Sequence, residues 1–153
     1  MLLFAVPLAI AVIVAAVIYV PRLLANPKYD FIYVDCDGYS CRDAFQVNDG
    51  RIVKNDSDPE FYDAMKLRYY DVSDGSSREL TTAEARNYRI INSSKSPDGY
   101  SIARESASGG FLFWSNSSEG WYLKNGAATK KVELSYSGSY YSSDIKFLGW
   151  VEQ

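Results

Sequence analysis

Residues 121–134 read Trp-Tyr-Leu-Lys-Asn-Gly-Ala-Ala-Thr-Lys-Lys-Val-Glu-Leu, and this stretch indicates what the chain is built from. Two short runs that suit an extended backbone flank Asn125-Gly126, and an Asn-Gly pair between such runs is a strong signal for a hairpin turn. Residues 68–80, Arg-Tyr-Tyr-Asp-Val-Ser-Asp-Gly-Ser-Ser-Arg-Glu-Leu, repeat the order of strand, glycine turn and strand. The sequence therefore predicts antiparallel hairpins.

The same pattern extends outward over residues 29–153, where Gly, Asn, Asp and Ser interrupt short segments rich in Tyr, Val, Ile and Trp. This alternation is typical of an all-β domain. Asn48-Asp49-Gly50 predicts another hairpin, and the capping-box spacing from Thr81 to Glu84 predicts a two-turn helix that ends near Tyr88. The predicted strands are 31–34, 44–47, 51–54, 66–72, 89–91, 100–104, 111–115, 121–124, 129–134 and 145–151.

Ser96-Pro-Asp-Gly-Tyr100, followed by Ser-Ile-Ala-Arg, resembles the turn and strand of TolB-type β-propeller blades. The resemblance covers roughly residues 66–151, and Phe147-Leu-Gly-Trp150 lacks the Pro-Asp-Gly of a second such turn. The chain is also similar to an uncharacterised family of small single-anchor proteins in bacteria with reduced genomes. That family has no assigned activity, so the resemblance implies a fold and says nothing of a mechanism. Blades take about 40–50 residues each and closed rings need about four. We therefore expect a mainly β fold of two to three propeller-blade-like units and no closed propeller.

Residues 1–20, Met-Leu-Leu-Phe-Ala-Val-Pro-Leu-Ala-Ile-Ala-Val-Ile-Val-Ala-Ala-Val-Ile-Tyr-Val, contain no charged side chain. A helix of about 20 apolar residues spans the hydrocarbon core of a bilayer, so this run predicts a transmembrane anchor. A cleaved signal peptide is the alternative, but it normally has a basic start and a shorter apolar stretch. A buried helix of a soluble domain is the other alternative, and it would normally be shorter and amphipathic.

Residues 21–28, Pro-Arg-Leu-Leu-Ala-Asn-Pro-Lys, form the connector between the anchor and the domain. Arg22 and Lys28 follow the apolar run, and the positive-inside rule by itself favours a cytoplasmic C-terminus. The Ser-, Tyr- and Trp-rich domain and its two close cysteines favour the opposite side. We predict a single-pass protein of the cell membrane whose C-terminal domain lies outside the cytoplasm.

Cys36 and Cys41 are the only cysteines, and in an oxidising compartment they would close a small loop as a disulfide. Free thiols are the alternative. Two cysteines without further Cys or His cannot complete a zinc site, and the C-x4-C spacing is not that of a C-x-x-C redox motif. The sequence therefore predicts a disulfide and no metal site.

The composition excludes several chemistries. The chain has no His, so His-dependent catalytic triads and His-ligated zinc are excluded. The formal net charge of −3 argues against nucleic-acid binding. Ser143 and Lys146 match a Ser-x-x-Lys dyad, but they stand at the entry to a predicted strand rather than on a helix. Residues 35–63 hold eight acidic residues, from which no catalytic carboxylate pair can be picked. We expect no enzyme activity and no cofactor.

Residues 135–143, Ser-Tyr-Ser-Gly-Ser-Tyr-Tyr-Ser-Ser, resemble antibody paratopes in composition. Tyr136, Tyr140 and Tyr141 are the candidate partner-binding residues, and a solvated loop is the alternative. Trp114, Trp121 and Trp150 are expected in the core of the β-domain rather than as sugar-binding platforms.

These observations predict a membrane-anchored, extracytoplasmic binding or assembly module without catalysis. Its expected partners are the lipid bilayer, through residues 1–20, and a protein partner or a second copy of the chain. One alternative is a subunit of an extracellular filament or surface layer, although residues 1–20 lack the acidic residue of a pilin helix. The other alternative is a small envelope hydrolase that uses carboxylates.

Overall fold

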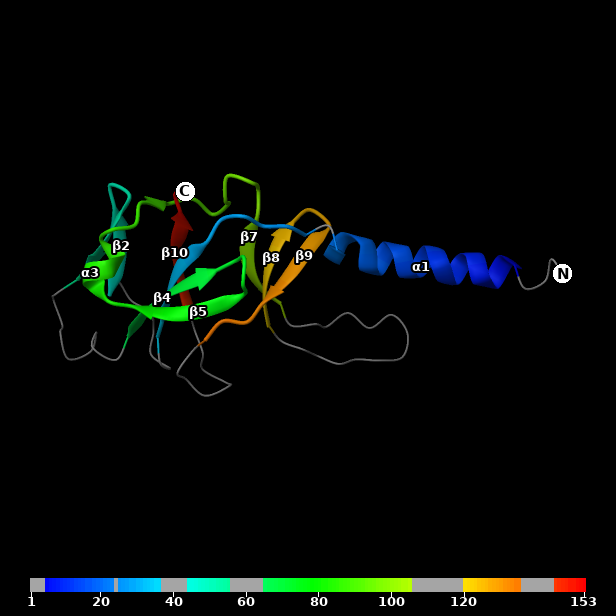
Figure 1. Cartoon of the computed structure of the whole chain (residues 1–153), viewed down its shortest axis with the longest axis horizontal. Coiled ribbons are helices and arrows are strands. Elements are labelled where there is room, and N and C mark those ends of the chain that lie inside the picture. Colours follow the sequence, from blue (N-terminus) through cyan, green and yellow to red (C-terminus); the bar gives the residue numbers. More distant parts are fainter. Residues whose placement is uncertain (1–4, 24, 37–43, 56–64, 106–119, 136–144) are drawn as a thin grey trace.

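The computed structural model describes residues 5–23, 25–36, 44–55, 65–105, 120–135 and 145–153. Its helices are α1 (Ala5–Leu23) and α3 (Thr82–Ala85). Its strands are β1 (Phe31–Asp35), β2 (Phe45–Asn48), β3 (Arg51–Lys54), β4 (Lys66–Asp71), β5 (Ser76–Leu80), β6 (Ile90–Ile91), β7 (Ser101–Glu105), β8 (Gly120–Asn125), β9 (Ala128–Val132) and β10 (Ile145–Val151). The chain after the connector is mainly β, as the sequence predicts. α1 projects away from the β-domain along the long axis of the molecule (Figure 1).

The strands form three antiparallel sheets in the described part of the chain. The central sheet has five strands in the order β5-β4-β1-β10-β6, so the first and last strands of the chain are neighbours. β2 and β3 form a two-stranded sheet, and β7, β8 and β9 form a three-stranded one. β1 is buried along its whole length, because β4 and β10 pair with its two edges and other elements cover both of its faces.

The central sheet is the middle layer of the domain. Alternate residues of β1 point to opposite faces, as the two-residue period of a strand requires. Ile32 and Val34 belong to a core that also contains side chains of β2, β3 and α3. Phe31 and Tyr33 belong to a second core, which the three-stranded sheet covers. β2 and α3 accordingly lie at one end of the domain, and β8 and β9 lie toward α1 (Figure 1).

An irregularity in β10 lets one strand fill both cores. Ile32 pairs with Gly149, but Tyr33 pairs with Phe147, so Leu148 has no partner on β1. Such a bulge shifts the alternation by one residue. Phe147 and Trp150 therefore both face the second core, with their ring centroids 5.1 Å apart, whereas Leu148 faces the first.

The predicted hairpins are confirmed, with one change of register. β2 and β3 are joined by Asp49 and Gly50, whose φ angles of 51° and 72° are both positive, as a tight primed turn demands. β4 pairs with β5 and β8 pairs with β9. The loop between β8 and β9 is Gly126-Ala127 rather than Asn125-Gly126, because Asn125 still pairs with Ala128. Gly126 thus takes the first central position, with a φ of 58°.

Two further predictions concern the order of the strands and the membrane anchor. The three-stranded sheet joins strands that follow one another among the described residues, whereas the predicted strand 111–115 lies outside them. The central sheet has a different order, because β10 lies between β1 and β6. The sequence did not indicate this long-range order. As for the predicted anchor, no helix within the described ranges combines the length and the apolar character that a membrane crossing needs.

Candidate functional site

The predicted partner-binding tyrosines, Tyr136, Tyr140 and Tyr141, lie outside the described residues, and their role stays a prediction. The same holds for the disulfide. Cys36 is completely buried in the first core, directly after β1, while Cys41 lies outside the described ranges.

The described tryptophans belong to the core, as predicted. Trp150 is completely buried, and its indole lies 5.7 Å from the ring of Phe31 in an edge-on arrangement. Trp121 is partly buried against the same core. Trp114 lies outside the described part of the chain. The two described indoles therefore stabilise the fold rather than form an exposed platform.

The described acidic residues of segment 35–63 do not come together in one site. Asp35 is buried and paired with Arg68, whose Nε lies 3.2 Å from its carboxylate, whereas Asp49 occupies the exposed β2–β3 turn. Ser143 is outside the described residues, and Lys146 lies on a strand and donates a hydrogen bond to the carbonyl of Phe45 at 3.3 Å. Lys146 is thus engaged with the backbone of β2, and it lacks the helical position that a Ser-x-x-Lys dyad needs.

The Ser96-Pro-Asp-Gly turn holds the connector that leads from α1. The Ser96 hydroxyl accepts a hydrogen bond from the Tyr100 amide at 2.8 Å, and Gly99 adopts a positive φ of 88° that closes the turn. The carboxylate of Asp98 accepts a hydrogen bond from the Lys28 amide at 2.9 Å. The Tyr100 hydroxyl accepts one from the amide of Asn26 at 3.0 Å. We call this arrangement the connector clamp.

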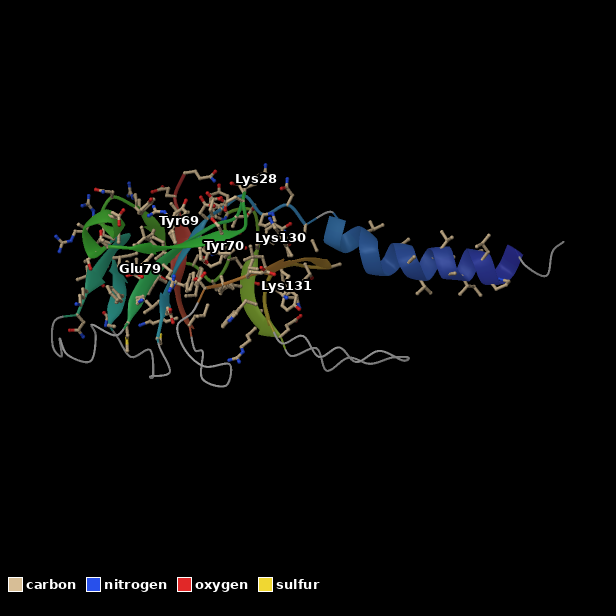
Figure 2. The ribbon with its side chains drawn as sticks, turned by 60° about the horizontal axis from the view of Figure 1, so that its bottom comes forward. Lys28, Tyr69, Tyr70, Glu79, Lys130 and Lys131 are labelled. Carbon is tan, nitrogen blue, oxygen red and sulfur yellow. The ribbon has the colours of Figure 1, made fainter. Side chains whose placement is uncertain are left out.

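The C-terminus completes the connector clamp, because the side-chain amide of Gln153 donates to the carbonyl of Lys28 at 2.7 Å. Pro27 is buried between these contacts. Lys28 lies on the side of the domain toward α1, as do Lys130 and Lys131 of β9 (Figure 2). The chain is therefore fastened to the domain directly after it leaves α1.

Asp30 joins the connector to the central sheet. Its carboxylate accepts hydrogen bonds from the Tyr69 hydroxyl at 2.5 Å and from the Val72 amide at 2.8 Å, while its carbonyl accepts one from Val151. Burial, followed by the bond to this carboxylate, raises the pKa of Tyr69, which keeps the hydroxyl protonated as a donor. Tyr70 points to the other face of β4, toward the three-stranded sheet (Figure 2).

A groove lies at the end of the domain that carries α3. Its volume is about 300 Å³, and it is lined by Asp49, Arg51, Arg86, Asn87, Tyr88 and Arg89. We call it the arginine groove. The first two lining residues come from the β2–β3 hairpin and the others from the segment after α3. No local sequence motif links these lining residues, so the sequence does not predict the groove.

Backbone contacts hold the two walls of the arginine groove together. The amide of Ile90 donates to the carbonyl of Gly50 at 2.8 Å, and the amide of Glu152 donates to the carbonyl of Arg89 at 2.8 Å. The ring of Tyr88 packs 5.3 Å from that of Tyr69, and Arg78 donates a hydrogen bond to the Tyr88 hydroxyl at 2.8 Å. Backbone and aromatic contacts therefore hold the residues beneath the groove in place, whereas its arginine side chains are exposed.

The described residues contain no group of three or more His, Cys, Asp or Glu side chains that could hold a metal ion. The arginine groove, with three arginines in its lining, is the candidate site of the described residues. Comparisons of the chain with protein-family models, with curated proteins and with solved structures found no match.

Proposed function

We propose that this protein is a membrane-anchored, extracytoplasmic binding or assembly module, with residues 1–20 as its anchor and residues 29–153 as its working domain. One observation carries the proposal. The apolar side chains of α1 are exposed: Leu8, Ile10, Val12, Ile13, Val14 and Val20 are between 44% and 68% exposed. Val53 is the other large apolar side chain in the described residues with comparable exposure.

Apolar side chains with this much exposure are expected to contact lipid or another protein surface. Burying a Val, Leu or Ile side chain is worth about 1.5–3 kcal/mol, so six such residues on one helix represent a cost on the order of 10 kcal/mol in water. Contiguous apolar surfaces of this kind mark membrane or protein contacts. The run of uncharged residues that begins at Met1 has the length of a bilayer span, which favours lipid as the cover.

The connector clamp suits an anchored module. Asn26 and Lys28 are bound to the β-domain within a few residues of the end of α1. A helix tied so closely to a domain would hold that domain at a set distance from the bilayer surface. Lys28 and Lys131 lie on this side, where they would meet lipid headgroups (Figure 2).

The sheet edges favour an assembly role over catalysis. In the described part of the chain, β5 and β9 lie at the edges of their sheets, with one strand neighbour each. Such edges offer unpaired backbone groups to a strand of a partner or of a second copy. A blade-like three-stranded sheet, completed by a partner, is the form of the fold that this proposal favours.

The anchor is tested by alkaline extraction of membranes from cells that express the full chain. We expect the wild type to stay in the pellet and the variant Val12→Lys/Ile13→Lys to move to the supernatant, because each charge at mid-helix costs about 2.5–3.5 kcal/mol. Val53→Lys is the control, since it places a single lysine on an exposed valine of β3, outside the helix. Extraction of the wild type into the supernatant would contradict the proposed membrane anchor.

The side of the membrane is tested with trypsin added to intact spheroplasts. We expect the domain to be digested from outside, and full protection until the membrane is lysed would contradict an extracytoplasmic location. An exposed apolar helix also suits packing in a filament. Fibres of the detergent-free chain in the electron microscope, together with alkaline extraction of the wild type, would favour that alternative.

A further inference from the structure

We propose that the arginine groove is a binding site for a small ligand that carries an oxyanion group, either a carboxylate or a phosphate. The site goes beyond the anchoring proposed above and stands whether or not α1 enters a membrane. It lies at the end of the domain where α3 and β2 are found, away from α1 (Figure 1).

Two of the three arginines of the groove differ in their partners from Arg68 and Arg78. Arg68 is paired with the buried Asp35, and Arg78 is paired with Glu84 and lies over the ring of Tyr69. Within the described part of the chain, Arg51 and Arg86 have no carboxylate partner. Two unpaired guanidinium groups and a third beside them therefore line one hollow.

The third guanidinium has a partner that a ligand can replace. Arg89 Nε lies 3.1 Å from the carboxylate of Glu152, and both side chains are exposed, so solvent screening keeps this ion pair weak. Asp49 is the other carboxylate at the groove. Three cations against two carboxylates leave a local positive charge on a chain whose formal net charge is −3. An incoming oxyanion would take the place of Glu152 at Arg89.

Guanidinium groups recognise carboxylates and phosphates by paired hydrogen bonds, which a lysine ammonium cannot make. The groove offers three guanidinium groups, and the hydrogen bond from the Ile90 amide to the Gly50 carbonyl joins the two segments that carry them. Asn87 and Tyr88 add a polar side chain and an aromatic one, which suit the rest of a small organic ligand. A volume of about 300 Å³ is at the small end of ligand pockets, so the ligand is a small molecule rather than a folded partner.

The test is a titration of the full chain in a nonionic detergent with inorganic phosphate and, separately, with citrate, at constant ionic strength. The Nε–Hε signals of the arginines are followed by NMR. We expect saturable shifts of Arg51, Arg86 and Arg89 with at least one probe. Tighter binding of phosphate would identify a phosphorylated ligand, and tighter binding of citrate a carboxylate.

Two double variants complete the test. Arg51→Gln/Arg86→Gln is expected to weaken binding about tenfold or more, because two charge-assisted contacts are lost. Lys66→Gln/Lys95→Gln removes the same charge from positions outside the groove and is expected to bind as the wild type does. The proposal is overturned if neither probe gives saturable shifts, or if both double variants weaken binding equally. Because detergent replaces the membrane, either result leaves the anchor to its own test.

Discussion

Gly149 is the residue at which the central sheet tolerates no side chain. A Cβ atom placed there would lie 2.4 Å from a methyl carbon of Ile90 and 2.7 Å from the carbonyl oxygen of Ile91. The second contact is with backbone, which cannot rotate away. Glycine at this position therefore lets β6 approach β10 beside the bulge at Leu148.

We expect Gly149→Ala to lower the free energy of unfolding by about 1–3 kcal/mol, the usual cost of overpacking a core. Chemical denaturation of the full chain in detergent measures this value. Gly120→Ala is the matched control, because its Cβ would meet only side chains, the flexible end of Lys131 at 3.4 Å and the ring of Tyr122 at 3.6 Å. Equal stability of Gly149→Ala and the wild type would show that β6 does not approach β10 so closely.

At the scale of the elements, α3 depends on its N-terminal cap. The amide of Thr81 donates to the carboxylate of Glu84 at 2.8 Å, and the amide of Glu84 donates to the hydroxyl oxygen of Thr81 at 3.2 Å, which is the predicted capping box. The hydroxyl of Thr81 also donates to this carboxylate at 2.9 Å. The helix is one turn, Thr82–Ala85, and shorter than the predicted two turns. Ala85 is completely buried, and the chain then turns toward β6, so packing ended the helix early.

The cap makes stability depend on pH. The backbone bond from Thr81, followed by its hydroxyl bond, holds the pKa of Glu84 below its ordinary value of 4.5. The ionised carboxylate thus favours the folded state. This stabilisation is complete above pH 4.5 and is lost as the pH falls through the lowered pKa. We expect Glu84→Gln to melt below the wild type at neutral pH and to match it in acid.

Thermal melts of both proteins from acid to neutral pH measure that difference. Glu79→Gln is the control, because Glu79 makes only an exposed ion pair with Lys66 at 3.6 Å. A gap between Glu84→Gln and the wild type that stays constant in acid would mean that the charge of Glu84 is not what stabilises the cap.

At the scale of the whole molecule, the connector clamp joins α1 to the β-domain. We expect Asp98→Ala to increase tryptic cleavage after Lys28 several-fold, since the carboxylate of Asp98 no longer holds the Lys28 amide. Mass spectrometry of membrane-bound protein measures the released domain. Asp74→Ala removes a comparable bond, from the Ser76 amide at 2.8 Å, in the β4–β5 turn and is the control. Unchanged cleavage in Asp98→Ala would contradict the clamp.

The local features of this fold were predictable from the sequence. Neighbouring residues decide the backbone angles of a tight turn and the hydrogen bonds of a cap, so the β2–β3 turn at Asp49-Gly50 and the box at Thr81 were readable. The shift of the β8–β9 turn by one residue shows the limit. The pairing of Asn125 with Ala128 places Gly126 at the first position of the two-residue loop instead of the second. This pairing depends on residues of both strands, beyond the turn itself.

The sequence by itself determined the mainly β character, the hairpins, the cap and the apolar run of residues 1–20, because each depends on the chemistry of residues close together in the chain. Only the tertiary structure decided that β10 pairs with β1, that the Ser96-Pro-Asp-Gly turn holds the connector, and that Arg51 meets Arg86 and Arg89 in one groove. These contacts join residues far apart in the chain. Whether they form depends on the packing of the two cores, which no local pattern records.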